Sequence, residues 1–269
     1  MCGRYAVTTD PARLAAEIDA VDEVSDGARN GAPAAADGLV SYNVAPSTTV
    51  MTVVDRHDHG RPEDPARRRV RAMRWGLVPS WSTDVASGPL LFNARAETLA
   101  EKPAFRRSLP GKRALIPMDG WYEWRPGPAG SDGKPSKIPF YMRPRDGSRL
   151  FMGALWAAWR PPRARAAGDD SEWLSSTTII TTDAVGPLTQ VHHRMPLIMP
   201  VEHWDRWLDP DRPVDASLLA PPDGALVDAI EIREVAPLVN RVANDGPELI
   251  AGVCGSAASG GRRRPAIYE

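Results

Sequence analysis

Proline and glycine interrupt this chain too often for long helices. Its 269 residues include 27 prolines and 22 glycines, and both residue types end or weaken a helix. Between these breaks, segments rich in Val, Ile, Thr and aromatic residues predict short strands. The predicted strands cover residues 48–54, 70–77, 113–117, 121–125, 138–143, 150–159, 176–182 and 226–235.

Few segments predict helices. Residues 10–20 begin with Asp10 at the N-cap position and Pro11 at the first helical position, and both favour a helix start. Helices are also predicted over residues 200–208 and within residues 97–109, beginning near Lys102. The remaining charged or Gly/Pro-rich stretches predict loops over residues 26–38, 55–69, 126–137 and 160–172.

This order of elements predicts one α+β domain. Many short strands with no regular alternation of strand and helix favour a barrel-like mixed or antiparallel sheet with a few short flanking helices. We expect this domain to span residues 2–254. Residues 255–269 are polar and basic, and predict a disordered tail.

The composition excludes several classes of protein. The chain is 42% hydrophobic and 25% charged, as in ordinary globular proteins, and no apolar stretch approaches the ~20 residues of a membrane span. Its start has no apolar signal-peptide core. Two cysteines, Cys2 and Cys254, predict a reducing cytoplasm and no disulfide framework. Because no CxxC or HExxH motif is present, we expect neither a metal nor a cofactor.

The net charge of −1 argues against a non-specific polyanion binder, but it hides an asymmetry. Basic residues gather in residues 61–74 and 95–113, whereas residues 201–250 hold eleven acids against four bases. A basic first half is compatible with a phosphate-facing surface. Solvated loops with ordinary salt bridges explain it equally well at this point.

Cys2 is the most unusual candidate for chemistry. If Met1 is removed, Cys2 carries a free α-amine and a thiol two carbons apart. Such an aminothiol can condense with an aldehyde to an imine and then close to a thiazolidine ring. The amine titrates at about pH 8 and the thiol at about pH 8.5, so both have a reactive fraction near neutrality. Alone, a cysteine at position 2 carries little weight.

Three further segments place polar groups among apolar neighbours. Asn93 follows Phe92, and His192 precedes His193, where side chains diverge too much for a shared metal. Glu123 lies in an aromatic strand whose alternation predicts Trp121 and Glu123 on one face. A buried Glu123 would have a raised pKa suited to proton transfer near pH 7. An exposed strand-face glutamate, a turn asparagine and a structural histidine are the open alternatives.

Together, these segments resemble the SRAP family (SOS response-associated peptidase), and the match covers most of the chain. The matching segments are Met1-Cys2-Gly3-Arg4, residues 42–46, residues 74–81, residues 93–98, residues 102–106, Arg113, Pro117, residues 120–124, residues 181–184, residues 192–196 and residues 239–242.

The resemblance implies a sensor that crosslinks to abasic sites in single-stranded DNA through a thiazolidine. It implies Cys2 as the nucleophile after Met1 removal, Asn93 as the residue that holds the reacting terminus, and Glu123 as a proton shuttle that also allows reversal. His192 would help to open the sugar. DNA contacts are expected from Arg4, Trp75, Trp81, Arg95, Phe105 and Arg194. Arg194 could instead be a structural salt-bridge residue.

Two other functions stay open. Cys2, His192 and Glu123 could form a cysteine-type peptidase, in line with the autoproteolytic, hydrolase or lyase activity that the family name and chemistry suggest. The chain could also be a single-stranded DNA binding protein whose Cys2 is incidental. In each case we expect a bacterial, cytoplasmic monomer that is nucleoid-associated when bound to DNA.

Overall fold

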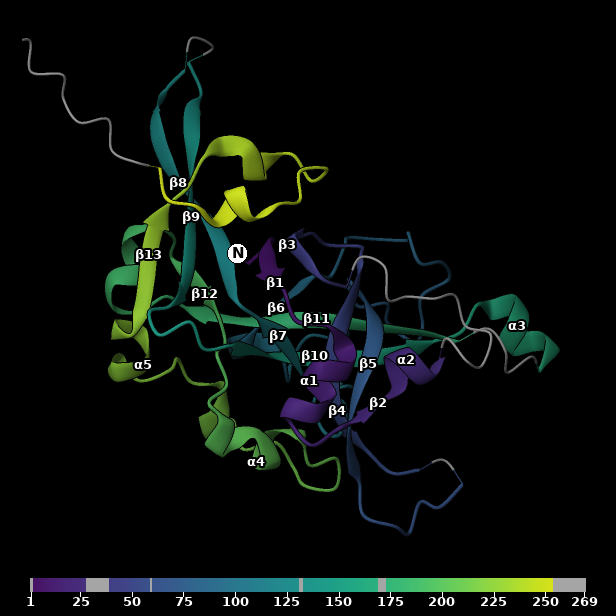
Figure 1. Cartoon of the computed structure of the whole chain (residues 1–269). Helices are drawn as coiled ribbons and strands as arrows, with labels where there is room; N and C mark the ends of the chain where they lie inside the picture. Colours follow the sequence, from purple (N-terminus) through teal and green to yellow (C-terminus); the bar gives the residue numbers. More distant parts are fainter. Residues whose placement is uncertain (1, 28–38, 59, 131–132, 169–172, 254–269) are drawn as a thin grey trace, which may run out of the picture.

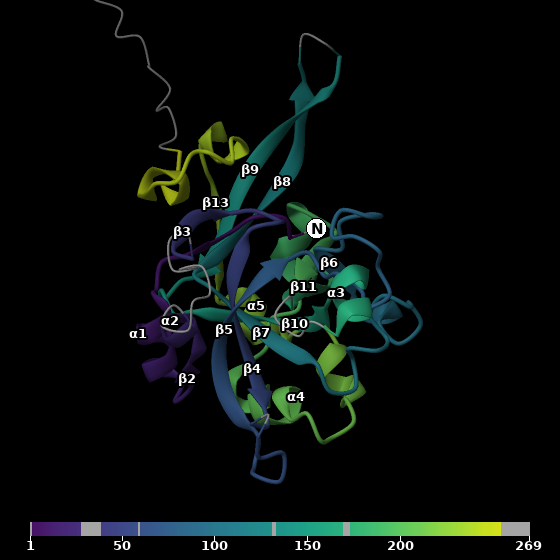
Figure 2. The same cartoon turned by 90° about the vertical axis from the view of Figure 1, so that its right-hand side faces the viewer.

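The computed structural model of the chain describes residues 2–27, 39–58, 60–130, 133–168 and 173–253 (Figures 1 and 2). Two sheets form its core. An eight-stranded sheet has the order β12-β11-β10-β7-β4-β5-β2, with β6 paired to β11, and a five-stranded sheet has the order β13-β9-β8-β1-β3.

Five strands of the larger sheet close into a barrel. Antiparallel pairing joins β5 to β4, β4 to β7, β7 to β10 and β10 to β11, and parallel pairing of Thr177 with Trp75 joins β11 back to β5. The predicted α+β class with a barrel-like mixed sheet is therefore confirmed. The strands of this sheet are β2 (Val21–Asp22), β4 (Thr49–Arg56), β5 (Arg67–Trp75), β6 (Asn93–Arg95), β7 (Arg113–Met118), β10 (Leu150–Trp159), β11 (Leu174–Asp183) and β12 (Arg194–Pro196).

The smaller sheet is built around the start of the chain. Strand β1 is an inner strand, paired antiparallel to β3 on one side and to β8 on the other. Strands β8 and β9 form a long hairpin that projects from the body of the protein (Figures 1 and 2). The strands of this sheet are β1 (Tyr5–Val7), β3 (Ser41–Val44), β8 (Gly120–Ala129), β9 (Pro135–Pro144) and β13 (Ile230–Glu234).

The helices are short and lie at the periphery. As predicted, α1 begins with Pro11, and the Asp10 carboxylate accepts a hydrogen bond from the Arg13 backbone N–H at 2.9 Å. In the described ranges, no helix has both the length and the apolar character to cross a bilayer. The α-helices are α1 (Pro11–Glu17), α2 (Glu23–Gly27), α3 (Pro162–Ala167), α4 (Trp204–Leu208) and α5 (Gly224–Asp228), and the 3-10 helices are Ala96–Thr98, Gly186–Gln190, Val201–His203, Ala216–Leu219, Pro237–Asn240 and Pro247–Ile250.

Two predicted elements are wrong. The helix predicted within residues 97–109 is replaced by the 3-10 helix Ala96–Thr98 and a series of turns. Pro103 has no backbone N–H, so the turn of Ala96–Thr98 cannot continue through it as a regular helix. The strand predicted over residues 226–235 begins only at Ile230. Residues before it form α5, whose N-cap Asp223 accepts a hydrogen bond from the Leu226 backbone N–H.

The predicted loops are shorter than expected. Helix α3 occupies part of residues 160–172, and the hairpin strands β8 and β9 extend into residues 126–137. Strands β4 and β5 likewise extend into residues 55–69. Most of the predicted insertion over residues 26–38 and the predicted tail over residues 255–269 lie outside the described residues.

Candidate functional site

Cys2 lies buried between the two sheets. Its exposed fraction is 0%, and its Sγ is 3.9 Å from the Sδ of Met152 on β10. The Tyr122 backbone N–H donates to the Arg4 carbonyl at 3.0 Å, so the segment before β1 runs along β8. Burial and the nearby Glu123 carboxylate both raise the pKa of the Cys2 thiol. The thiol is therefore held in its neutral form at rest.

Asn93 is hydrogen-bonded directly to the Cys2 backbone. Its Nδ2 donates to the Cys2 carbonyl at 2.8 Å. Asn93 opens β6, which pairs with β11, and the Trp75 indole N–H donates to the Phe92 carbonyl at 2.8 Å just before it. The Asn93 Oδ1 is buried and has no hydrogen-bond partner among the described residues. The amide can thus still accept a hydrogen bond beside Cys2.

Glu123 is a buried carboxyl group on β8. Its exposed fraction is 3%, and burial raises its pKa to about 7. The predicted alternation is confirmed, since Trp121 packs into the main core while Tyr122 packs with Tyr141 in a second cluster on the opposite face. At neutral pH Glu123 can therefore either take or give a proton.

The position of Glu123 depends on a sharp corner between the two sheets. Strand β7 ends at Met118 and β8 begins at Gly120, so the chain crosses from the barrel to the smaller sheet at Asp119. A Cβ atom on Gly120 would clash with the Met142 carbonyl oxygen and the Tyr141 ring. Glycine is therefore required for the close approach of β8 and β9 at this corner.

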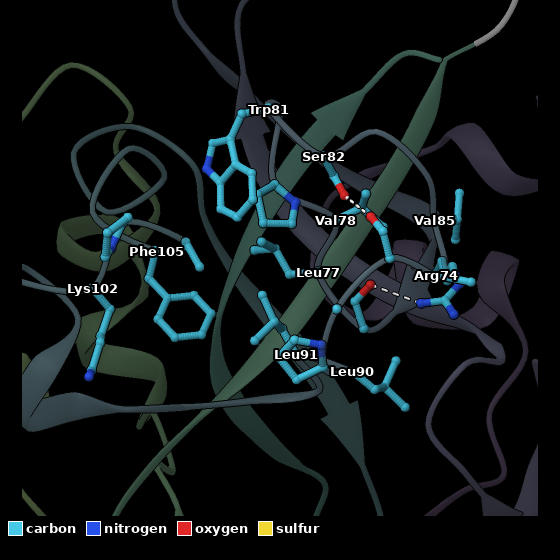
Figure 3. Close-up of a pocket in the computed structure, with 18 of the residues that line it drawn as sticks. Arg74, Leu77, Val78, Trp81, Ser82, Val85, Leu90, Leu91, Lys102 and Phe105 are labelled. Carbon is cyan, nitrogen blue, oxygen red and sulfur yellow. Dashed lines mark hydrogen bonds between the residues drawn. The ribbon is translucent and has the colours of Figure 1, made fainter. Parts of the chain in front are cut away.

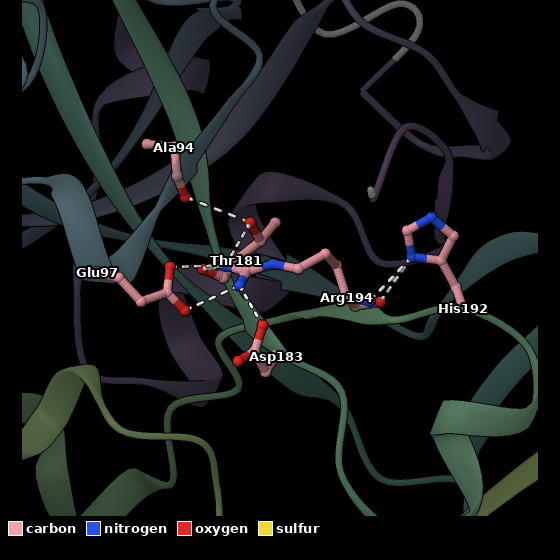
Figure 4. A network of polar contacts seen from close by, with 6 residues as sticks. All are labelled: Ala94, Glu97, Thr181, Asp183, His192 and Arg194. Atoms are coloured by element: carbon pink, nitrogen blue, oxygen red, sulfur yellow. Dashed lines mark hydrogen bonds and ion pairs between the residues drawn. The ribbon is translucent and has the colours of Figure 1, made fainter.

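His192 is anchored to the Arg194 backbone through one ring nitrogen. Its Nδ1 lies 3.0 Å from the Arg194 backbone nitrogen and 3.2 Å from the Arg194 carbonyl oxygen, so either neutral tautomer finds a partner there (Figure 4). Burial lowers the pKa of His192. The predicted divergence of His192 and His193 is wrong, because the two rings stack with a centroid distance of 4.3 Å. At neutral pH the lowered pKa thus favours the neutral ring.

Glu123 and His192 line one cleft, called the Cys2 cleft below. It has a volume of about 720 Å³, and its lining also includes Gly3 and Phe92. Cys2 and Asn93 do not line it, but Cys2 directly precedes Gly3 and Asn93 directly follows Phe92 in the chain. Within the described part of the chain, no group of three or more His, Cys, Asp or Glu side chains is placed to hold a metal ion.

The buried Arg194 side chain forms an ion-pair network with two exposed carboxylates (Figure 4). Its side chain is 7% exposed and donates to Glu97 at 2.8 and 3.0 Å, to Asp183 at 2.6 Å and to the Thr181 carbonyl at 2.6 Å. These acceptors occupy its guanidinium, which supports the structural alternative for Arg194. The network also joins the 3-10 helix Ala96–Thr98, β11 and β12 next to His192.

The other predicted DNA contacts differ widely in exposure. The Trp75 ring is 0% exposed and packs against Tyr5 and Phe92, so it offers no face to a base. Arg4 is tied to Asn43 Oδ1 at 2.9 Å and to the Val239 carbonyl at 2.8 Å. Arg95 is exposed on β6.

Trp81 and Phe105 line a separate groove of about 690 Å³ (Figure 3). Trp81 is 58% exposed and Phe105 is 7% exposed. Leu77, Leu90 and Leu91 add to its apolar wall (Figure 3). The exposed indole can accept a stacked base, whereas Phe105 only shapes the wall.

Asn43 is a residue whose importance the sequence reasoning missed. Its Nδ2 donates to the carbonyls of Arg241 and Asn244 at 3.0 and 2.9 Å, while its Oδ1 accepts from Arg4. It thereby holds the end of the described chain against β3. The sequence signal was present, because Asn43 lies in one of the matching segments, but its partners are about 200 residues away.

Comparisons with known proteins agree on one family. The family described as SOS response associated peptidase (SRAP) matches residues 1–242. The abasic site processing protein YoqW of Bacillus subtilis is 37% identical over 213 residues, which cover 78% of this chain and 85% of YoqW. The chicken abasic site processing protein HMCES is 30% identical over 275 residues, covering 93% of this chain and 77% of HMCES.

Solved structures share the fold. A Bacteroides thetaiotaomicron protein superposes with a TM-score of 0.73 at 23% identity, covering 94% of this chain and all of that protein. A phage-related protein of Bordetella bronchiseptica superposes with a TM-score of 0.57 at 27% identity, covering 87% of this chain and 94% of that protein. With a family match over residues 1–242 and relatives of 30–37% identity, this chain belongs to the SRAP family.

Proposed function

We propose that this protein processes abasic sites in DNA by forming a thiazolidine between Cys2 and the aldehyde of the opened abasic sugar. The hydrogen bond from Asn93 to the Cys2 carbonyl carries the proposal, because it fixes the backbone of the residue that becomes the chain terminus once Met1 is removed. The names of the relatives, which are abasic site processing proteins, support it independently.

The chemistry needs proton transfers in both directions. The α-amine of Cys2 attacks the aldehyde carbon, and the resulting carbinolamine loses water to give an imine. The Cys2 sulfur then adds to the imine carbon while its proton passes to the nitrogen, so one water is released overall. Glu123, with a pKa of about 7, can accept the amine proton and protonate the departing hydroxyl.

His192 and Glu123 have complementary protonation states in this scheme. In the tautomer whose Nδ1 accepts from the Arg194 N–H, neutral His192 donates from Nε2, which suits a contact with a sugar or phosphate oxygen. A protonated Glu123 beside the ring nitrogen or sulfur would also assist reopening, so the crosslink is reversible. Because the aldehyde is consumed, β-elimination and strand breakage at the lesion are prevented while the ring is closed.

A peptidase acting on other proteins is less well supported. Its nucleophile would have to be the Cys2 thiol, which is buried and has a raised pKa. A thiolate is the nucleophilic form, so such a thiol is poorly activated for attack on a peptide carbonyl. Self-cleavage of the bond between Met1 and Cys2 would still agree with the word peptidase in the family description.

Intact mass measurement tests the proposal. Protein lacking Met1 is incubated with a single-stranded oligonucleotide that carries one abasic site, and the mixture is denatured before mass analysis. We expect a one-to-one adduct whose mass is one water less than the sum of its components. Cys2→Ala and a form that retains Met1 should give none.

Two controls sharpen the result. The same oligonucleotide with an intact base must give no adduct, and the lesion in a duplex should react more slowly if single strands are preferred. Binding without an adduct would instead favour a non-covalent DNA-binding protein, and cleavage of a test peptide would favour the peptidase.

A further inference from the structure

A second cleft lies beside helix α3, away from the Cys2 cleft. It has a volume of about 490 Å³ and is called the basic groove below. Its described lining contains no acidic side chain, and the acidic run at residues 169–172 lies outside the described residues. The aromatic and basic residues that line the groove are Trp81, Arg107, Lys112, Arg160, Arg165 and Trp173.

Lys112, which lines this groove, is held close to a second cation, Arg56, which does not line it. The Lys112 Nζ lies 5.2 Å from the ring centroid of Trp156, and the Arg56 guanidinium carbon lies 5.1 Å from the same ring. Burial lowers the pKa of both groups, and their mutual repulsion lowers the pKa of Lys112 further. Neither has an ion-pair partner among the described residues. A bound anion would relieve this repulsion.

Aromatic rings flank the charges. Trp81 is 58% exposed and Trp173 is 54% exposed, and the Arg160 guanidinium lies 5.1 Å from the Trp173 ring centroid. Exposed rings interleaved with cations are typical of surfaces that bind nucleic acid, where bases stack and phosphates pair. Trp81 also lines the apolar groove of Figure 3, so the two grooves share a wall.

We propose that the basic groove binds the phosphodiester backbone of the DNA that flanks the lesion, with Arg107 and Lys112 as the main phosphate contacts. This inference rests on the proposed function for the identity of its ligand. It extends the DNA path from the Cys2 cleft past Trp81 to the barrel end next to α3. None of Arg107, Lys112 or Trp173 takes part in the chemistry at Cys2.

The salt dependence of binding tests the groove. Each phosphate contact on single-stranded DNA adds about 0.7 to the slope of log K against log salt concentration. The double variant Arg107→Gln with Lys112→Gln should lower that slope by about 1.4 for an undamaged 20-nucleotide single strand. The matched control, Arg61→Gln with Arg212→Gln, removes the same charge from exposed residues outside the groove and should leave the slope unchanged.

The outcomes separate this inference from the proposed function. A lowered slope with an unchanged yield of adduct at saturating abasic DNA supports both. A lowered slope without any adduct, even in the unmodified protein, supports the groove and overturns the crosslink. If the groove variant has the same salt slope as the control variant, the basic groove does not bind DNA and the proposal is overturned. A groove that binds an acidic protein instead of DNA would give this result.

Discussion

At the scale of single residues, the burial of Glu123 makes stability depend on pH. Its pKa is about 7 in the folded protein against 4.5 for an ordinary glutamate. Between these values the folded state binds more protons than the unfolded state, so the free energy of unfolding falls as pH rises from about 4.5 to 7. Above pH 7 the full free-energy cost of burying the ionised Glu123 carboxylate is present.

Glu123→Gln should remove this dependence. The free energy of unfolding of the variant minus that of the unmodified protein is expected to rise by on the order of 3 kcal/mol from pH 4 to pH 8. Urea unfolding at the two pH values measures the gain. An equal difference between the two proteins at both pH values would mean that Glu123 is not buried as described.

The same pKa predicts the pH profile of crosslinking. If deprotonated Glu123 takes the amine proton, the rate of adduct formation should rise through about pH 7, and this inflection should be missing in Glu123→Gln. Single-turnover rates from pH 5.5 to 8.5 measure both profiles. The inflection from the α-amine near pH 8 should persist in both proteins, which provides the internal control.

Arg194 is expected to contribute to stability rather than to DNA binding. Arg194→Met leaves the Thr181 carbonyl without its donor and unpairs Glu97, so the free energy of unfolding should fall by about 2–3 kcal/mol. Because Asp183 is 75% exposed, Asp183→Asn should change stability by less than 1 kcal/mol. A phosphate contact at Arg194 would instead show as a lowered salt slope with unchanged urea unfolding.

At the scale of elements, the link between β5 and β6 positions Asn93. Trp75→Phe removes the hydrogen bond to the Phe92 carbonyl, and we expect it to cost about 2 kcal/mol of stability and to slow crosslinking. Its affinity for undamaged single-stranded DNA should not change, since the ring is buried. Urea unfolding, adduct formation and fluorescence anisotropy measure the three effects.

Trp81→Ala provides the converse comparison. This ring is 58% exposed, so its removal should weaken single-stranded DNA binding by about 5-fold or more while changing stability by less than about 0.5 kcal/mol. If Trp75→Phe weakened DNA binding as much as Trp81→Ala does, the description of Trp75 as a ring without DNA contact would be wrong.

The strands were predictable because their signal is local. β-branched residues mark β4 and β11, a run of apolar and aromatic residues marks β10, and Asp10 with Pro11 marks the start of α1. The turns over residues 99–111 and helix α5 were not predicted. In the first segment prolines interrupt a pattern that otherwise favours a helix, and in the second the N-cap Asp223 starts a short helix where the apolar residues favour a strand. The closure of β11 on β5 depends on residues about 100 apart, and no local pattern encodes it.

The site shows the same division. Alternation in β8 places Glu123 beside Trp121 from the sequence alone, and the structure agrees. The bond between Asn93 and Cys2 joins residues 91 apart, so only the family resemblance pointed to it. The burial of Trp75 and the network around Arg194 could not be read from residue types that suit DNA contacts equally well.

At the scale of the whole molecule, the last described residues are joined to the smaller sheet. The Val253 backbone N–H donates to the Glu234 carbonyl at 3.0 Å and joins the end of the described chain to β13. We therefore expect a chain ending at Cys254 to keep the same melting temperature and yield of adduct. Thermal unfolding and intact mass measure both, and a melting temperature lower by several degrees would move the domain boundary beyond Cys254.

The central place of β1 has a consequence for how the protein is made. This strand leaves the ribosome well before its neighbour β8 and before Met152, which covers the Cys2 sulfur, because both follow more than 100 residues later. At about 5–20 residues per second, roughly 8–30 s pass before about 150 residues are made. During that interval the nascent chain presents Cys2 to the enzymes that trim chain ends, and also to oxidants and stray aldehydes. Cys2 becomes buried only when the fold is complete.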